Sequence, residues 1–240
     1  MIKVDVPTFE HKLISTGKVI KCRPFLVKEE KLLLMAMESD DPKDLLNATT
    51  QVIENCILSE GVDIATLPYF DIEYLILDLR AKSIGDKVQL SFVCHNILEE
   101  DKECGHHFKS GISIQDVAIH KEDMIEGKIP LNGDTGVQMK FPSYQTMKIA
   151  ANEPDSLQQR IDLLAQSIEA VWDKDTVYKG STLTKQDIVD FIENLTKEDF
   201  NKMQAFIDGA PWLRIEKVVK CPKCNFETEV TYEGFESFFA

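Results

Sequence analysis

The chain has 240 residues, 43% of them hydrophobic, and a formal net charge of −14 at pH 7. This hydrophobic content is enough to bury a core, so the sequence predicts a folded protein rather than a disordered tail. The negative charge would repel nucleic-acid phosphates, and no apolar run is long enough to span a membrane. Because the N-terminal residues lack the apolar core of a secretory signal, we expect no export by that route.

The N-terminal region predicts a β-hairpin followed by a helix. Residues 11–25 indicate two short strands around a turn at Thr16-Gly17, because glycine readily adopts the positive φ of a tight hairpin. Proline is tolerated in a first helical turn, and the apolar residues that follow predict a helix from Pro24 to Glu38. The run Leu32–Met37 is wider than one helix face needs, so this helix is either fully buried or also offers a surface to a partner.

Two further helices are predicted by their start and stop signals. Asp41-Pro42 combines a capping side chain with a proline in the first turn, and the helical spacing of apolar residues continues to Ile57. Pro68 predicts the start of the next helix, which ends where Gly85 can take the left-handed conformation of a cap. The first third of the chain is therefore predicted to be a hairpin and three helices.

From Lys87 the hydrophobic pattern changes to the period of two that is typical of β-strands. Residues 87–94 and 107–117 predict strands on either side of a loop that carries Cys94 and Cys104. Residues 129–141 predict another hairpin, because turn-forming residues separate two apolar stretches.

The remainder predicts helices and then strands again. Ser156 can cap a helix that continues to Trp172. The apolar stripe of this helix is predicted to consist of Leu157, Ile161, Leu164, Ile168 and Val171. Thr184 and Thr196 are each followed three residues later by an aspartate, which predicts two short helix starts. Residues 213–234 return to strand alternation.

Four of the six cysteines form two pairs, Cys94 with Cys104 and Cys221 with Cys224. Each pair lies between strand-patterned flanks, and its second cysteine is followed by Gly105 or Asn225, which accept the left-handed conformation that a zinc knuckle requires. We therefore predict a structural zinc site, because four thiolates fill the tetrahedron and leave no open position for catalysis. The metal would join parts of the chain that lie 116 residues apart, so that the middle segment is an insertion within one unit.

The site leaves alternatives open. Nine residues separate Cys94 from Cys104, where a compact knuckle has two to four, although loop-closure entropy grows only slowly with length. His95, His106 or His107 could replace one cysteine ligand. The CPKC motif alone would be a redox pair, but a thioredoxin-like pair opens a helix, which this hairpin context does not offer.

No phosphate-binding loop, dinucleotide-binding glycine pattern, nucleophile elbow or metalloprotease helix motif is present, so we do not expect an enzyme. Two other classes remain as alternatives. One is a thiol redox enzyme that uses Cys221 and Cys224. The other is a zinc-ribbon protein that binds nucleic acid in transcription or replication, for which Lys217, Lys220 and Lys223 are the available basic cluster.

Together these patterns predict an α+β protein with a zinc-ribbon-like β unit, split by a long insertion, and with helical segments on both sides. We interpret the 240 residues as a single composite domain. Its predicted segments are a β-hairpin over 1–23, a helical segment over 24–85, strands with the first cysteine pair over 86–142, a helical insertion over 143–209, and a β-hairpin with the second cysteine pair over 210–240.

Several of these segments resemble the T4 bacteriophage base plate protein family over nearly the whole chain. The resemblance is carried by the N-terminal hairpin, the Arg23–Ser39 segment RPFLVKEEKLLLMAMES, the IENCIL helix, the Asp71–Cys94 segment and the terminal CPKC hairpin. It implies a role in building the tail hub of a contractile-tailed phage, as a hub component or a hub assembly chaperone. The implied partners are other baseplate and tail hub proteins.

The resemblance also implies where the protein acts, namely in the host cytoplasm during assembly, and in the virion baseplate if it is retained. A homo-oligomer remains an alternative, because the sequence does not specify an oligomeric state. The C-terminal segment carries Phe235, Phe238 and Phe239, and such an aromatic end predicts docking on the protein's own core or on a partner.

Overall fold

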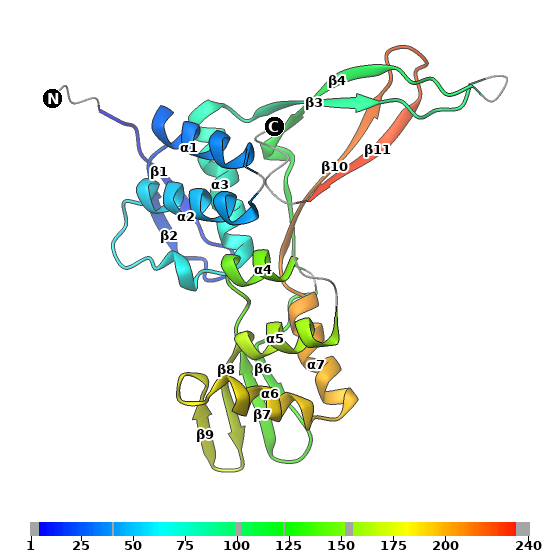
Figure 1. Ribbon diagram of the computed structural model, residues 1–240. Helices are drawn as coiled ribbons and strands as arrows, with labels where there is room; N and C mark the ends of the chain where they lie inside the picture. Colours follow the sequence, from blue (N-terminus) through cyan, green and yellow to red (C-terminus); the bar gives the residue numbers. More distant parts are fainter. Residues whose placement is uncertain (1–4, 40, 99–101, 122, 152–155, 234–240) are drawn as a thin grey trace. The chain divides into compact units, whose positions relative to one another are not determined.

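The protein is described here from a computed structural model. The described residues are 5–39, 41–98, 102–121, 123–151 and 156–233. The contacts within the chain divide it into two compact units (Figure 1). Unit 1 consists of Met1–Ile64, Glu73–Ile119 and Trp212–Ala240, and unit 2 of Ala65–Ile72 and His120–Pro211. That the two units form a single composite domain remains an interpretation. Unit 1 is made of three separate segments of the sequence.

The fold class is α+β, as the sequence predicts. The elements that begin in unit 1 are β1 (Phe9–Lys12), β2 (Val19–Cys22), α1 (Val27–Met37), α2 (Pro42–Cys56), β3 (Lys87–Val93), β4 (His107–Ser113), β5 (Ala118–His120), β10 (Trp212–Lys220) and β11 (Glu227–Glu233). Helix α3 (Tyr69–Ile84) has its first residues, through Ile72, in unit 2 and the rest in unit 1.

The predicted N-terminal hairpin is confirmed, since β1 and β2 pair antiparallel and Gly17 has a φ of 68°. The predicted start of the first helix at Pro24 is wrong, because α1 begins at Val27. The reason is tertiary. The Phe25 N–H donates to Ser83 Oγ in α3 at 2.9 Å, and the Leu26 N–H donates to the Glu29 carboxylate at 2.7 Å, which holds these residues ahead of the first turn.

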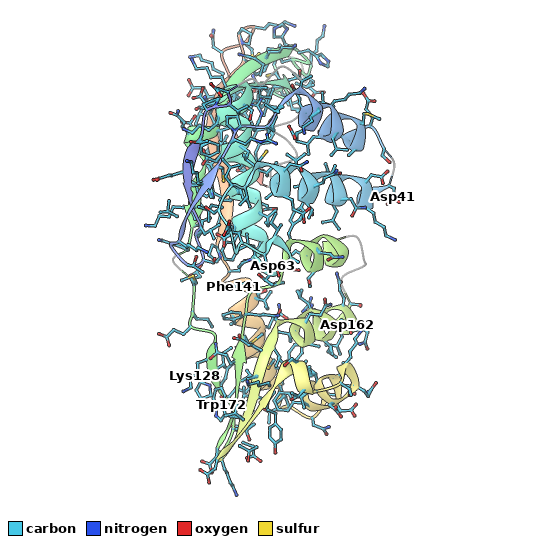
Figure 2. The ribbon with its side chains drawn as sticks, turned by 90° about the vertical axis from the view of Figure 1, so that its left-hand side faces the viewer. Asp41, Asp63, Lys128, Phe141, Asp162 and Trp172 are labelled. Carbon is cyan, nitrogen blue, oxygen red and sulfur yellow. The ribbon has the colours of Figure 1, made fainter. Side chains whose placement is uncertain are left out.

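The next two helices have the predicted ends. The Asp41 side chain, labelled at the start of α2 in Figure 2, accepts the Lys43 N–H at 2.9 Å. Helix α3 follows Pro68 directly and is followed by Gly85, which has a φ of 103°. Within α3, Leu75, Ile76 and Leu79 are completely buried, so this helix forms the centre of the unit 1 core.

Two antiparallel hairpins, β3–β4 and β10–β11, carry the cysteine pairs at their ends, and we call them the cysteine hairpins. The predicted strands on both sides of each pair are confirmed, except that the strand predicted over 107–117 ends at Ser113, whose hydroxyl caps the 3-10 helix Ile114–Asp116. Lys217 Nζ donates to the Gly111 carbonyl at 2.7 Å, and the rings of Phe92 and Tyr232 meet edge to face at 6.4 Å. The two hairpins therefore contact each other at these strand residues as well as at the cysteines.

Unit 2 combines helices with a sheet whose strand order is β6-β7-β8-β9. Its elements are β6 (Lys128–Pro130), β7 (Thr135–Met139), α4 (Tyr144–Ala151), α5 (Leu157–Ser167), β8 (Ile168–Asp173), β9 (Thr176–Lys179), α6 (Lys185–Glu193) and α7 (Lys197–Asp208). The predicted hairpin over 129–141 is confirmed by β6 and β7, and the two predicted hydroxyl caps are confirmed at α6 and α7.

The predicted helix from Ser156 to Trp172 is wrong in its second half. Ser156 caps α5 as expected, but the helix ends at Ser167, and Ile168 begins strand β8. Strand β8 pairs with β7 on one side and β9 on the other, so its backbone groups are satisfied by the sheet rather than by a helix. The segment 143–209 is therefore not purely helical, because it contains the β8–β9 hairpin.

The core of unit 2 is made of apolar side chains from its sheet and helices. Phe206 in α7 is buried and stacks on Phe141 with ring centroids 4.4 Å apart. On the sheet, the Lys128 ammonium lies 5.6 Å from the centre of the Trp172 ring, and Figure 2 labels both residues. No described helix is long and apolar enough to cross a membrane. The aromatic end of the chain, with Phe235, lies outside the described residues.

Candidate metal centre

The fold brings all four predicted ligands together, although the two pairs lie far apart in the sequence. Cys94 Sγ lies 3.5 Å from Cys224 Sγ, and Cys104 Sγ lies 4.0 Å from Cys221 Sγ. All four sulfur atoms are within 4.8 Å of one another. Three of the four side chains are buried and Cys224 is half-buried. We call this group the four-cysteine cluster.

The cluster has the dimensions of a four-thiolate zinc site. Zinc binds thiolate sulfur at about 2.3 Å in a tetrahedron, so neighbouring sulfur atoms are about 3.8 Å apart. The sulfur separations of 3.5 and 4.0 Å fall on either side of this value. All six cysteines are free thiols, so no disulfide competes for these side chains. The donor set and its spacing therefore fit a zinc ion.

The second pair forms a compact knuckle between β10 and β11. The Cys221 N–H donates to the Phe226 carbonyl at 2.9 Å, and the Asn225 N–H donates to the Cys221 carbonyl at 2.9 Å. Asn225 has a φ of 58°, which is the left-handed conformation predicted for the residue after the second cysteine. These contacts turn the chain so that both thiols of the pair lie on the same side.

The first pair has the same backbone frame despite its longer loop. The Cys94 N–H donates to the His106 carbonyl at 3.0 Å, and the Gly105 N–H donates to the Cys94 carbonyl at 3.0 Å. Gly105 has a φ of 57°, again as predicted. The two knuckles thus make equivalent bonds from the first cysteine and from the residue after the second.

The described residues of the insertion in the first knuckle pair with one another. Ile97 and Glu103 are bridge partners, and the Leu98 N–H donates to the Lys102 carbonyl at 2.8 Å. The Cys104 N–H donates to the Asn96 carbonyl at 2.8 Å, which closes the insertion beside the cluster. The long spacing is therefore accommodated by local pairing, and the knuckle frame is kept.

Backbone N–H groups also point at the sulfur atoms, and they set the acidity of the thiols. The Phe226 N–H donates to Cys224 Sγ and, with the neighbouring thiols, lowers the pKa of Cys224 to about 7. The Asn96 N–H acts in the same direction on Cys94, but burial and the surrounding thiols outweigh it and raise the pKa of Cys94 to about 12. Metal binding would therefore displace protons from the more basic thiols.

Sequence reasoning missed the part played by Asn96. Its side-chain amide lies 3.8 Å from Cys224 Sγ, so it donates across the cluster to the opposite pair. The only signal in the sequence is its place two residues after a cysteine, which matches the positions of His106 and Phe226 after their own cysteines. The role of this position is recognised once the two knuckles are compared in space, because the backbone N–H at each of these three positions donates to the cysteine two residues before it.

The histidines considered as replacement ligands do not belong to the cluster in the part of the chain that is described. His95 is exposed and contacts the Glu103 carboxylate. His107 is exposed on β4, and the ring of His106 stacks on Phe108 with centroids 6.3 Å apart. The thiols are therefore the groups that the fold presents to an ion.

The CPKC motif lies in a turn between two strands, where no helix begins at its first cysteine. This position lacks the helix N-terminus that activates a thioredoxin-like cysteine. Cys221 and Cys224 also share their surroundings with the thiols of the first pair. The arrangement favours joint coordination of an ion over exchange between two cysteines.

Similarity to a known protein family extends over nearly the whole chain and is not limited to the cysteines. No curated protein and no solved structure gives a significant match. The family described as T4 bacteriophage base plate protein matches residues 6–240, which include both knuckles, all of the described unit 2 and the N-terminal helices. The chain therefore belongs to the T4 bacteriophage base plate protein family.

Proposed function

We propose that this base plate protein is a tail hub component or a hub assembly chaperone that acts by binding other baseplate proteins, without catalysis. The observation that carries the proposal is an exposed apolar face on helix α1. A face of this kind on a strongly charged chain is typical of a surface that a partner covers.

Helix α1 has two apolar faces, of which the core uses only one. Leu33 and Ala36 are buried against unit 1. On the other side, the side chain of Val27 is 81% exposed and that of Met35 59% exposed, and Leu34 is exposed beside them. Of the two alternatives for the Leu32–Met37 run, full burial is thus excluded for its central residues. We call Val27, Leu34 and Met35 the α1 face.

A groove of about 760 Å³ begins at the N-terminal end of this face. Its lining combines five apolar residues with three polar ones, namely Val6, Phe25, Leu26, Val27 and Ile84 with Lys28, Glu30 and Ser83. The groove and the α1 face share Val27, so the two apolar features adjoin on unit 1. Interfaces concentrate their binding energy in such apolar centres, with Met and aromatic residues enriched there.

The four-cysteine cluster has a structural part in this proposal. A zinc ion held by Cys94, Cys104, Cys221 and Cys224 would stabilise the cysteine hairpins and would leave no coordination position for a substrate. The support is the agreement between the sulfur separations and a regular four-thiolate tetrahedron. The metal would keep the hairpins in one arrangement for assembly.

The nucleic-acid alternative has less support. Lys217 Nζ is bonded to the Gly111 carbonyl, Lys220 pairs with Glu227 at 3.3 Å, and Lys223 Nζ donates to the Cys104 carbonyl at 3.4 Å. The three lysines thus contact groups within the protein, and phosphate binding would compete with these contacts.

The test is affinity capture of the tagged protein from phage-infected cells, with mass spectrometry of the captured proteins and of purified virions. The double variant Val27→Ser/Met35→Ser removes apolar area from the α1 face. Leu157→Ser is the matched control, because Leu157 is 66% exposed on a helix of unit 2.

We expect the wild type and the control to capture baseplate proteins and the double variant to capture them at least tenfold less. Presence in virions would identify a hub component, and absence would identify a chaperone. Equal capture by all three proteins would remove the α1 face from the proposal, and capture of polymerase subunits alone would overturn the proposed function.

A further inference from the structure

Unit 2 contains a second groove, independent of the α1 face and of the cysteines. It has a volume of about 400 Å³, within the range of sites that hold a ligand or a side chain of a partner. It lies between the β7–β8–β9 part of the sheet and helix α6. We call it the α6 groove.

The walls of the α6 groove come from one face of the sheet and one stripe of the helix. On the sheet, Val171 and Tyr178 are directly paired neighbours on β8 and β9. On the helix side, Asp187 and Phe191 lie four residues apart on one face of α6, and Leu183 lies in the extended segment just before the helix. Val171, Leu183 and Phe191 make its centre apolar.

The rim of the groove is negatively charged. Asp173, at the end of β8, and Asp187 both line it, and none of the described lining residues is a lysine or an arginine. Asp187 caps α6 through its Oδ2 atom, which accepts the Thr184 O–H at 2.7 Å and N–H at 2.9 Å. These bonds lower the pKa of Asp187, so the carboxylate is ionised at neutral pH.

Strand β9 gives this groove an edge to which another strand can add. Among the described strands β9 pairs with β8 alone, and all four of its residues are exposed. Main-chain groups at the free edge of a sheet can bind an extended segment, while neighbouring pockets select its side chains. A segment along β9 would lie beside Tyr178 at the mouth of the groove.

We propose that the α6 groove binds an extended segment of another protein, in which an apolar side chain enters the groove and a lysine or arginine two residues away, on the same face of the segment, reaches Asp173 and Asp187. A second copy of this chain is disfavoured as the occupant, because each copy has a net charge of −14. The inference rests on the proposed function only in that the other protein belongs to the baseplate.

The test uses the full-length protein and a defined probe, the peptide acetyl-Thr-Val-Leu-Val-Arg-Thr-amide, in which leucine and arginine lie on the same face when the peptide is extended. Two comparison peptides replace its arginine with glutamate or its leucine with alanine. Binding is followed by NMR from the methyl signals of Val171 and Leu183. The variant Asp173→Asn removes one rim charge, and Asp175→Asn is the matched control, since Asp175 is exposed in the same hairpin but does not line the groove.

We expect saturable shifts of both methyl signals with the arginine peptide and at least tenfold weaker binding of each comparison peptide. Asp173→Asn should weaken binding of the arginine peptide about tenfold, and Asp175→Asn should change it less than twofold. Absence of binding, equal binding of the glutamate peptide, or self-association at this groove would overturn the inference. Capture of baseplate proteins through the α1 face would be unaffected by these outcomes, so the two proposals fail separately.

Discussion

The cysteine hairpins and unit 2 are both built around antiparallel strands, but different interactions hold them together. The buried cluster at the end of the hairpins consists of Cys94, Cys104 and Cys221, with Phe108 and Cys224 packed against it. Unit 2 instead buries a large set of aliphatic and aromatic side chains from its sheet and helices. Where few apolar side chains are available, four thiols occupy the centre, and a bound ion would supply the missing stability.

The two tryptophans of the chain allow this comparison to be tested, because Trp212 belongs to unit 1 and Trp172 to unit 2. A Trp172→Phe background reports on the cysteine hairpins, and a Trp212→Phe background reports on unit 2. In these two backgrounds, each substitution below changes either the cysteine hairpins or unit 2.

The largest effect is expected from loss of the metal. Structural zinc contributes roughly 10 to 16 kcal/mol of apparent folding free energy in zinc-finger peptides, so Cys221→Ser or a strong chelator should unfold the cysteine hairpins. The measurements are zinc content by mass spectrometry and Trp212 fluorescence in the Trp172→Phe background, with Trp172 fluorescence in the Trp212→Phe background as the control. Unchanged Trp212 fluorescence in a metal-free protein would contradict a structural role for the ion.

The converse change is Phe206→Ala in the core of unit 2. Removing a buried phenylalanine from a packed core costs about 3 to 5 kcal/mol, and here the stacked partner Phe141 also loses its contact. Urea denaturation followed by Trp172 should show a lower midpoint, while the zinc content stays at that of the wild type. A loss of zinc equal to that of Cys221→Ser would show that the two parts do not differ as proposed.

A smaller effect separates the two knuckles. Gly105 and Asn225 share a left-handed conformation, and a Cβ added at Gly105 would meet no atom within 4 Å. Gly105→Ala should therefore cost about 1 kcal/mol through its backbone conformation alone. Asn225→Gly should change the free energy of unfolding by less than about 0.5 kcal/mol. Unfolding of the zinc-loaded protein, followed by Trp212, measures both, and equal costs would contradict a left-handed requirement at these two positions.

The smallest effect is a dependence of unit 2 on pH. The Thr184 bonds lower the folded-state pKa of Asp187, so the stability that this carboxylate adds is present above its unfolded pKa of about 4. That stability is lost as the pH falls through the folded pKa. The Trp172 urea midpoint should therefore fall less between pH 5 and pH 3 in Asp187→Asn than in the wild type, and identical pH profiles would contradict this assignment.

Local signals predicted much of the fold, as particular residues show. The caps at Asp41, Ser156 and Thr184 mark helix starts in the structure, because a side chain that accepts a backbone N–H acts within one turn. The apolar stripe that includes Ile168 wrongly predicts a helix as far as Trp172. An apolar residue at every third or fourth position is also compatible with a shorter helix followed by a buried strand. Pairing of β8 with β7 decides between them, and β7 lies about 30 residues earlier in the sequence.

The candidate site divides in the same way. The sequence by itself determined the four cysteines, the strands that flank them and the left-handed residues after them, because these depend on chemistry and backbone geometry within a few residues. Only the tertiary structure decided that the sulfur atoms meet at one point, that Asn96 donates across the cluster, and that α1 leaves Val27 and Met35 exposed. Those features depend on contacts between segments distant along the chain, and burial and pairing across such distances are properties of the folded state alone.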